Sequence, residues 1–220
     1  MMTPQNALVL DFGGVVTRTL FETHDLTERA LGLAAGTLTW RGPFDPQNDP
    51  LWKRMQADEI SERDYWMTRT GEVGKLVGQP WSAMADFVKA ARGADPEPII
   101  RPQALAAIET ARQAGVKLAI LSNELDLFYG AEFRKKLPFL ADFDVIIDAT
   151  YSDVLKPDPR AYQACCDALQ LEPAACVFVD DQKRNIDGGR KVGMQCVHFD
   201  VLHPDDGYRR ALQHLGLDRD

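Results

Sequence analysis

The chain has 220 residues, of which 45% are hydrophobic and 26% are charged. This composition can bury the core of one large domain, or of one domain with a smaller insertion, and it excludes disorder, a collagen-like structure and a coiled coil. Acidic residues (33) outnumber lysine plus arginine (25), and the net charge of −8 disfavours binding to nucleic acids or to anionic membranes.

The first predicted element is a short buried strand at Ala7–Leu10. It ends in Asp11-Phe-Gly-Gly, a sequence that is typical of a tight glycine-rich turn. The next comparable strand, Val116–Leu121, follows only after a long intervening segment.

The intervening segment carries helical signals and no convincing strand. Ser61-Glu-Arg-Asp64 resembles a capping box that opens a helix, and Trp81–Ala91 has an amphipathic pattern. We therefore predict a helical insertion at residues 19–98, which divides a core domain made of residues 1–18 and 99–220. The aromatic side chains of Trp52, Tyr65 and Trp66 are predicted to pack inside this insertion.

After the insertion, helices and strands alternate. Pro102–Ala114 begins with proline and is followed by Gly115, as helices often are. The later predicted elements are strands at Phe143–Ile147, Cys176–Val179 and Gln195–Phe199 and helices at Pro159–Leu169 and Asn185–Val192. This alternation predicts an α/β, Rossmann-like core, in which helices cover both faces of a parallel sheet.

The cysteine pattern and the hydropathy favour a cytoplasmic protein. The four cysteines all lie in the last quarter of the chain and form no C-x-x-C motif, so we expect free thiols in a reducing compartment. The apolar run at residues 7–10 is too short for a signal peptide, and no window approaches the roughly 18 apolar residues of a membrane span. The sequence carries no signal for an oligomeric state.

Candidate functional residues follow the predicted strands, because ligands bind beyond the carboxyl ends of strands in open parallel sheets. These residues are Asp11, Ser122, Asn123, Lys156, Asp180 and Asp181. Taken singly, each could be a helix cap or a surface residue, but together at one edge of the sheet they point to a site.

The residue types fit phosphoryl transfer. Asp11 and Asp181 could supply the carboxylates that Mg²⁺ prefers, and Asp11 could then attack phosphorus to form an aspartyl-phosphate. Lys156 adds a positive charge that offsets the charge of a phosphate. Further hydrogen bonds to a phosphate could come from the Ser122 hydroxyl and from the backbone N–H groups of Phe12, Gly13 and Asn123.

Four segments resemble, in order, the four motifs of the haloacid dehalogenase superfamily. They are Asp11-Phe-Gly-Gly-Val-Val-Thr17, Leu121-Ser-Asn123, Leu155-Lys-Pro157 and Val177-Phe-Val-Asp-Asp181. The helical insertion stands where this family places its cap domain, so the resemblance covers essentially the whole chain. It implies an enzyme of the phosphatase type, which hydrolyses a small phosphorylated molecule with Mg²⁺.

The resemblance also implies a role for each candidate. Asp11 is then the nucleophile and a metal ligand, and Lys156 neutralises charge in catalysis. The further metal ligands are the Gly13 carbonyl, Asp181 and Asp180, and the phosphate-binding groups are Phe12, Gly13, Ser122, Asn123 and Lys156. Two adjacent buried carboxylates at 180 and 181 would repel each other without a cation, which also favours a metal.

One position departs from the family pattern. Most phosphatases of this family carry a second aspartate two residues after the nucleophile, which protonates the leaving group and activates water, whereas this chain has Gly13, as some phosphatases of the family do. A missing acid–base group costs about 10²–10⁴-fold in rate. A replacement could come from the helical insertion, where Glu22, His24 and Asp25 are nearest in sequence, although His24 by itself fits a surface position. Glycine suggests a positive φ at residue 13, which would strain any side chain there.

Two other functions are compatible with the same motifs. One is a metal-independent 2-haloacid dehalogenase in which Asp11 attacks carbon, and the Asp180–Asp181 pair argues against it because that chemistry has no use for a cation. The other is a non-catalytic protein that binds a phosphorylated ligand and lost turnover when it lost the second aspartate.

Overall fold

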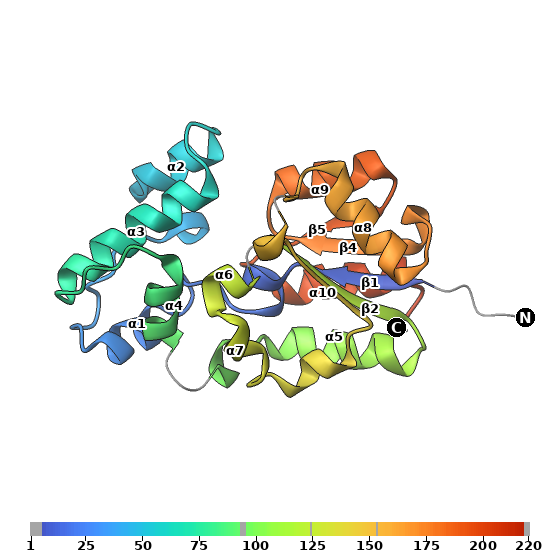
Figure 1. Cartoon of the computed structure of the whole chain (residues 1–220), viewed down its shortest axis with the longest axis horizontal. Helices are drawn as coiled ribbons and strands as arrows, with labels where there is room; N and C mark the ends of the chain where they lie inside the picture. Colours follow the sequence, from blue (N-terminus) through green and yellow to red (C-terminus); the bar gives the residue numbers. More distant parts are fainter. Residues whose placement is uncertain (1–5, 93–95, 124, 153, 218–220) are drawn as a thin grey trace, which may run out of the picture.

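The protein was analysed as a computed structural model that describes residues 6–92, 96–123, 125–152 and 154–217. Five strands form a single parallel sheet in the order β3-β2-β1-β4-β5 (Figure 1). Their bounds are Ala7–Leu10 (β1), Lys117–Ser122 (β2), Val145–Asp148 (β3), Cys176–Asp180 (β4) and Gln195–His198 (β5). The central position of β1 confirms the predicted doubly wound sheet.

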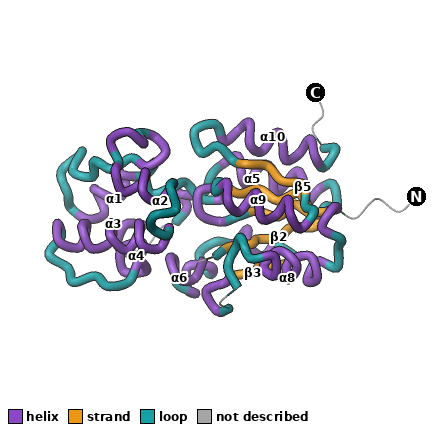
Figure 2. The backbone as a smooth tube through the Cα atoms, turned by 90° about the horizontal axis from the view of Figure 1, so that it is seen from above, coloured by secondary structure: helices purple, strands orange, loops and turns teal. Residues whose placement is uncertain are grey.

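Helices cover both faces of the sheet (Figures 1 and 2). One face packs against α5 (Pro102–Gln113) and α10 (Pro204–His214), and the other packs against α8 (Pro159–Leu169) and α9 (Lys183–Val192). Side chains of β1 alternate between the two cores, so that Leu8 lies in the first and Val9 in the second. Because both faces are covered, the strands are continuous apolar runs.

The sequence misplaced or missed some elements of the core. The predicted boundaries of the core elements agree with the structure within two residues; α9, for example, begins at Lys183 rather than Asn185. Helix α10 was not predicted, because its buried face consists of only Gly207, Tyr208 and Ala211 and gives a weak apolar pattern. Two short helices, α6 (Leu125–Tyr129) and α7 (Ala131–Arg134), follow β2.

The helical insertion lies to one side of the sheet (Figure 1). It contains α1 (His24–Leu31), α2 (Pro50–Gln56), α3 (Glu62–Leu76) and α4 (Met84–Arg92), and its described residues form no strand. The predicted capping box is present: the Asp64 N–H donates to Ser61 Oγ over 3.1 Å, and the Ser61 N–H donates to Asp64 Oδ2 over 3.0 Å. The insertion has its own aromatic core around Phe21, Tyr65 and Trp66.

The two linkers between the insertion and the core lie side by side. Thr17 and Ile100 form an antiparallel bridge. The Arg18 N–H donates to the Ile99 carbonyl over 2.7 Å, and the Arg101 N–H donates to the Val16 carbonyl over 3.0 Å. Both linkers therefore leave the core beside the turn that follows β1, which places the insertion over the carboxyl ends of the strands. Residues 93–95 of the predicted return linker lie outside the described residues.

Two further findings concern the helices and the cysteines. None of the helices formed by the described residues is long and apolar enough to cross a membrane. The four cysteines, all in the described part of the chain, are buried and form no disulfide.

Candidate active site

The register of the sheet brings Asp11 beside Asp180. Leu10 of β1 pairs with Val179 of β4, so the next residue of each strand lies at the same level. The Asp11 N–H also donates to the Val179 carbonyl over 2.9 Å. Two carboxylates therefore meet at the carboxyl end of the sheet, as the sequence predicted.

Lys156 bridges these two carboxylates. Its Nζ lies 2.8 Å from Asp11 Oδ1 and 2.6 Å from Asp180 Oδ2, and its side chain is 1% exposed. Burial acts to lower the pKa of Lys156, but the charges and hydrogen bonds of Asp11 and Asp180 outweigh it and raise that pKa. The ammonium group therefore stays charged between the two carboxylates.

The side chain of Asn123 holds the loop that carries Lys156. Its side-chain Oδ1 accepts a hydrogen bond from the Lys156 N–H at 2.7 Å, and its Nδ2 donates to the Lys156 carbonyl at 3.1 Å. The Asn123 side chain thus fixes the backbone of Lys156. The group of Asn123 that could bind a phosphate is therefore its backbone N–H. The predicted partner Ser122 is buried and lines the same cavity. The Phe12 backbone hydrogen-bonds the Asp11 carboxylate and acts to lower its pKa.

Asp180 is fully buried, and its oxygens are already engaged within the protein. Besides Lys156, it accepts hydrogen bonds from the Gln182 N–H at 2.8 Å and from Asn185 Nδ2, which lies 3.1 Å from both carboxylate oxygens. Sequence reasoning did not assign Asn185, although its position in the first turn of the helix that follows Asp180 and Asp181 was a usable signal. Asn185 lines the cavity, and its Oδ1 is buried and has no hydrogen-bond partner among the described residues.

The glycine that the turn requires is Gly14 rather than Gly13. Gly14 has φ +79°, and a Cβ there would lie 2.6 Å from Asp181 Oδ2. Gly13 has φ −71° and ψ 127°, and a Cβ there would meet no described atom within 4 Å. The expectation of a positive φ at Gly13 is therefore wrong, and position 13 has room for a side chain.

The acidic cluster has the composition of a divalent-cation site. Asp11, Asp180 and Asp181 each offer an oxygen, and these oxygens lie within 4.8 Å of one another. Burial raises the pKa of Asp11 to about 7, against the effect of Lys156, and burial together with the neighbouring carboxylates raises the pKa of Asp181 well above its ordinary value. Oxygen donors with unbalanced negative charge fit Mg²⁺, and the unpartnered Asn185 Oδ1 adds a further acceptor nearby.

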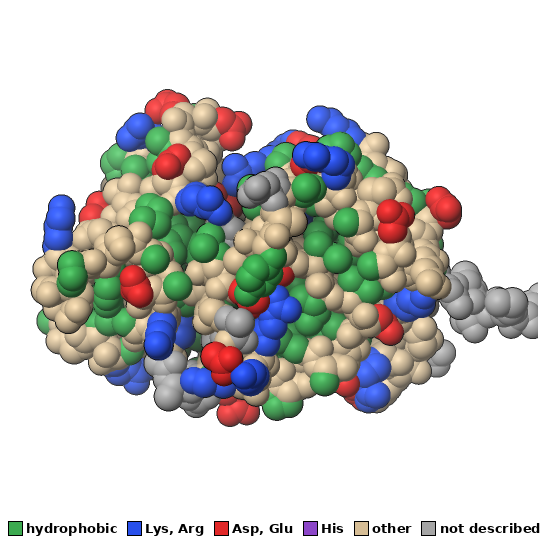
Figure 3. Space-filling model, viewed as in Figure 1, with side chains coloured by type: hydrophobic (Ala, Val, Ile, Leu, Met, Phe, Trp, Pro, Cys, Tyr) green, Lys and Arg blue, Asp and Glu red, His purple; other side chains and the backbone are tan. Residues whose placement is uncertain are grey.

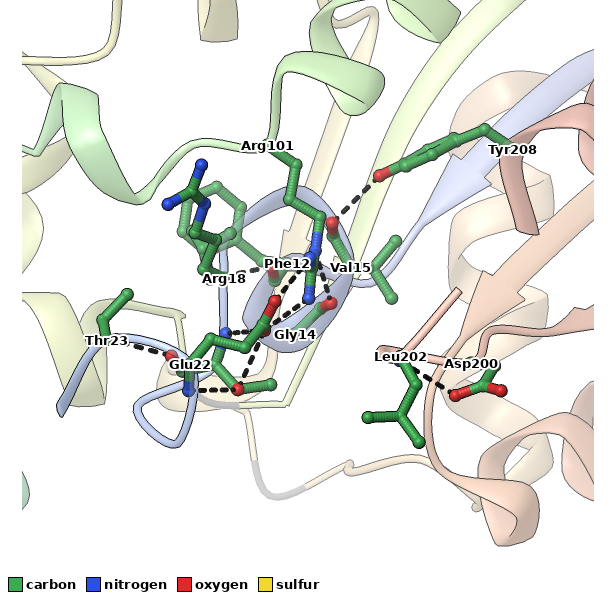
Figure 4. Close-up of polar contacts among 12 residues, drawn as sticks. Phe12, Gly14, Val15, Arg18, Glu22, Thr23, Arg101, Asp200, Leu202 and Tyr208 are labelled. Atoms are coloured by element: carbon green, nitrogen blue, oxygen red, sulfur yellow. Dashed lines mark hydrogen bonds and ion pairs between the residues drawn. The ribbon is translucent and has the colours of Figure 1, made fainter. Parts of the chain in front are cut away.

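Glu22 belongs to the hinge rather than to the cavity. It forms an ion pair with Arg101, with N–O distances of 2.8 and 2.6 Å, and Arg101 Nε donates to the Gly14 carbonyl over 3.1 Å (Figure 4). This network ties the first linker, the second linker and the turn after β1 together. Glu22 is consequently a structural residue of the hinge.

His24 and Asp25 also fail as acid–base candidates. His24 is buried against Trp40, with ring centroids 4.3 Å apart, and its ring nitrogens have no hydrogen-bond partner in the described part of the chain. Burial lowers the pKa of His24 to about 4, and the expectation of a surface position is wrong. Asp25 is exposed and pairs with Arg29. Among the described residues that line the cavity, none of the three candidates occurs.

The cavity lies between the helical insertion and the core, where the molecular surface is hollowed (Figure 3). Its apolar wall is formed by Leu20, Phe21, Trp52, Trp66, Met84, Val88, Leu125, Phe128 and Tyr129. Its charged lining outside the acidic cluster and Lys156 comprises Arg18, Glu62 and Arg92, which sequence reasoning did not single out. No motif marks these three residues, because only the placement of the insertion over the core brings them to the cavity.

The doubly wound parallel sheet, the carboxylates and lysine at its carboxyl edge and the helical insertion after its first strand define an α/β hydrolase class with a covering domain. Residues 5–193 match the family model of the haloacid dehalogenase-like hydrolases. The chain belongs to this family, and the predicted resemblance is confirmed.

Relatives carry the names of both phosphatases and dehalogenases. The chain is 36% identical over 117 residues to phosphatase MT3486 of Mycobacterium tuberculosis, which covers 52% of this chain and 54% of the relative. It is 30% identical over 113 residues to (S)-2-haloacid dehalogenase 1 of Pseudomonas sp., a match that covers 51% of this chain and 49% of the relative. Each match thus spans about half of the relative. The structure of L-2-haloacid dehalogenase of Xanthobacter autotrophicus shares the fold, with a TM-score of 0.58 and 22% identity. The match covers 89% of this chain and 77% of the dehalogenase.

Proposed function

We propose that this protein is a Mg²⁺-dependent phosphatase that hydrolyses a small-molecule phosphomonoester through an aspartyl-phosphate on Asp11. The observation that carries the proposal is the cluster of three carboxylates, two of which are paired with one buried lysine. With Lys156 charged and the carboxylates ionised, the cluster has a net charge of −2, which one divalent cation would balance. A cytoplasmic location remains part of this proposal.

The roles in the core follow from the contacts. Asp11 is the nucleophile and would share the metal with Asp181 and the Gly13 carbonyl, while Asp180 acts by orienting Lys156. The metal ion, when bound, would neutralise phosphate oxygens and polarise phosphorus for attack. Lys156, Ser122 and the backbone N–H groups of Phe12, Gly13 and Asn123 would bind the remaining phosphate oxygens.

The helical insertion would recognise the rest of the substrate. We propose the domain division of residues 1–18 and 99–220 as the catalytic core and residues 19–98 as the cap. The apolar wall contributed by Phe21, Trp52, Trp66 and their neighbours suits a substrate whose leaving group is apolar or aromatic.

A second candidate, a 2-haloacid dehalogenase, is favoured by the similarity to dehalogenases over half the chain. A single panel separates the candidates: the purified protein is assayed for phosphate release from phosphomonoesters and for halide release from 2-chloropropionate, with Mg²⁺ or with EDTA. We expect phosphate release only with Mg²⁺. Halide release in EDTA would establish the dehalogenase instead, and ligand binding without any turnover would establish a non-catalytic binding protein.

The metal site leads to a prediction for Asp181→Asn. We expect the Mg²⁺ concentration for half-maximal activity to rise about 100-fold, because an amide oxygen replaces a charged ligand. Ca²⁺ should inhibit the wild type, since its looser coordination would misplace the attacking carboxylate. Metal titrations of activity and calorimetry measure both effects, with Asp187→Asn on the same stretch of chain as the control, because Asp187 pairs with Lys183 outside the cavity. Full activity in EDTA would refute the metal site.

Gly13 leads to a prediction about leaving groups. Without an acid at position 13, kcat/KM should fall steeply as the pKa of the leaving group rises, so aryl, acyl and anomeric sugar phosphates should react better than simple alkyl phosphates. Gly13→Asp should flatten this dependence and raise kcat/KM for alkyl phosphates by about 10²–10⁴-fold, since the backbone there accepts a side chain. Gly13→Asn, which cannot donate a proton in this way, is the control. A flat dependence in the wild type would contradict the prediction.

A further inference from the structure

Hydrolysis of an aspartyl-phosphate needs a base that Gly13 does not provide. In an in-line displacement, the leaving group departs and water enters on the side of phosphorus opposite Asp11. Asp11 lies at the core end of the cavity, and the helical insertion forms the opposite wall. A group that activates this water is therefore expected on the wall formed by the insertion.

Glu62 meets this requirement. Among the described residues that line the cavity, it is the only carboxylate outside the cluster of Asp11, Asp180 and Asp181. It is the first residue of α3, and its side chain is 29% exposed. Its carboxylate lines the same cavity as Asp11 and Asp181 although it belongs to the insertion.

Two local features hold Glu62 in place. The capping box of Ser61 and Asp64 fixes the first turn of α3, in which Glu62 is the first residue. Arg184 of α9 places its Nη2 3.0 Å from Glu62 Oε2, and this ion pair joins the insertion to the core (Figure 1 shows the two helices). The ion pair keeps the Glu62 carboxylate at the cavity, and a carboxylate can accept a proton from water.

We propose that Glu62 is the general base of the second half-reaction; this inference depends on the proposed phosphatase function. Glu62 takes a proton from water as the water oxygen forms a bond to phosphorus. The bond between phosphorus and the Asp11 oxygen breaks, Asp11 departs as a carboxylate, and inorganic phosphate is formed. The proton passes from Glu62 to solvent when phosphate leaves, so the wild type needs no acid for this step.

The test is pre-steady-state kinetics of Glu62→Gln with p-nitrophenyl phosphate and Mg²⁺. We expect kcat to fall about 10²–10⁴-fold. KM should fall with it, so that kcat/KM is unchanged, because attack by Asp11 does not involve Glu62. A burst of one nitrophenolate per enzyme should precede the slow turnover, and acid quenching should trap the phosphoenzyme. Glu59→Gln is the matched control, since Glu59 is exposed, pairs with Arg54 and does not line the cavity.

A purely structural role for the Glu62–Arg184 pair predicts a different result. If the pair only holds the insertion closed, Glu62→Gln and Arg184→Met should raise KM alike and lower kcat/KM, without accumulation of phosphoenzyme. That result, or dephosphorylation of Glu62→Gln at the wild-type rate, would overturn the inference. Restoration of kcat in Glu62→Gln by a second change, Gly13→Asp, would support it. Failure of the wild type to form any phosphoenzyme would instead refute the proposed function.

Discussion

Replacing Asp11 with asparagine is expected to lower kcat for phosphomonoesters by about 10⁴-fold or more while the fold is retained. The amide is nearly isosteric with the carboxylate but is not a nucleophile toward phosphorus. The loss of one negative charge from a crowded acidic cluster also removes repulsion, so the fold should tolerate the change.

Steady-state kinetics and thermal unfolding together test this expectation. Beryllofluoride with Mg²⁺, which mimics the acyl phosphate, should stabilise the wild type against heat and leave Asp11→Asn unchanged. Undiminished activity of Asp11→Asn, measured beside an unchanged melting temperature, would rule out Asp11 as the nucleophile.

The second large effect is expected for Lys156→Met, which should abolish turnover and also destabilise the fold by about 3–5 kcal/mol. The cost arises because Asp180, which is fully buried, loses its charged partner and keeps only the hydrogen bonds from Asn185 and the Gln182 N–H. Asp11 is less affected, since its side chain is 14% exposed and reaches solvent.

A double variant separates stability from catalysis at this site. Lys156→Met with Asp180→Asn removes both charges and should recover most of the lost stability in urea unfolding, but none of the activity. Lys183→Met, which alters an exposed lysine, is the control and should leave the unfolding midpoint unchanged. Unfolding of Lys156→Met at the wild-type urea concentration would show that the buried ion pair does not stabilise the fold.

The sequence by itself determined the fold class and the core of the candidate site. Strands such as Ala7–Leu10 are uninterrupted apolar runs, so local composition marks them, and their alternation with helices leaves only a parallel sheet. Residues directly after parallel strands must meet at one edge, which is why Asp11, Lys156 and Asp180 could be brought together in advance. The start of α3 was also predictable, because a capping box is a contact between residues three apart.

Side-chain direction at this edge was decided only by the tertiary structure. Asp180 and Asp181 are adjacent in sequence, but the first points into the protein toward Lys156 and Asn185, and the second faces the cavity beside Gly14. The same holds for Asn123, whose side chain turns to the Lys156 backbone. Motif spacing does not encode these directions, because they depend on the backbone angles of each turn.

The residues on the cavity wall opposite Asp11 could likewise not be predicted from the sequence. Proximity along the chain suggested Glu22, which the structure ties to Arg101 at the hinge, whereas Glu62 reaches the cavity from a later helix. The contact of Glu62 with Arg184 joins residues 122 positions apart. Such contacts depend on how the helical insertion packs over the core. That packing is set by the summed free energy of many apolar contacts, which cannot be predicted from a local sequence pattern.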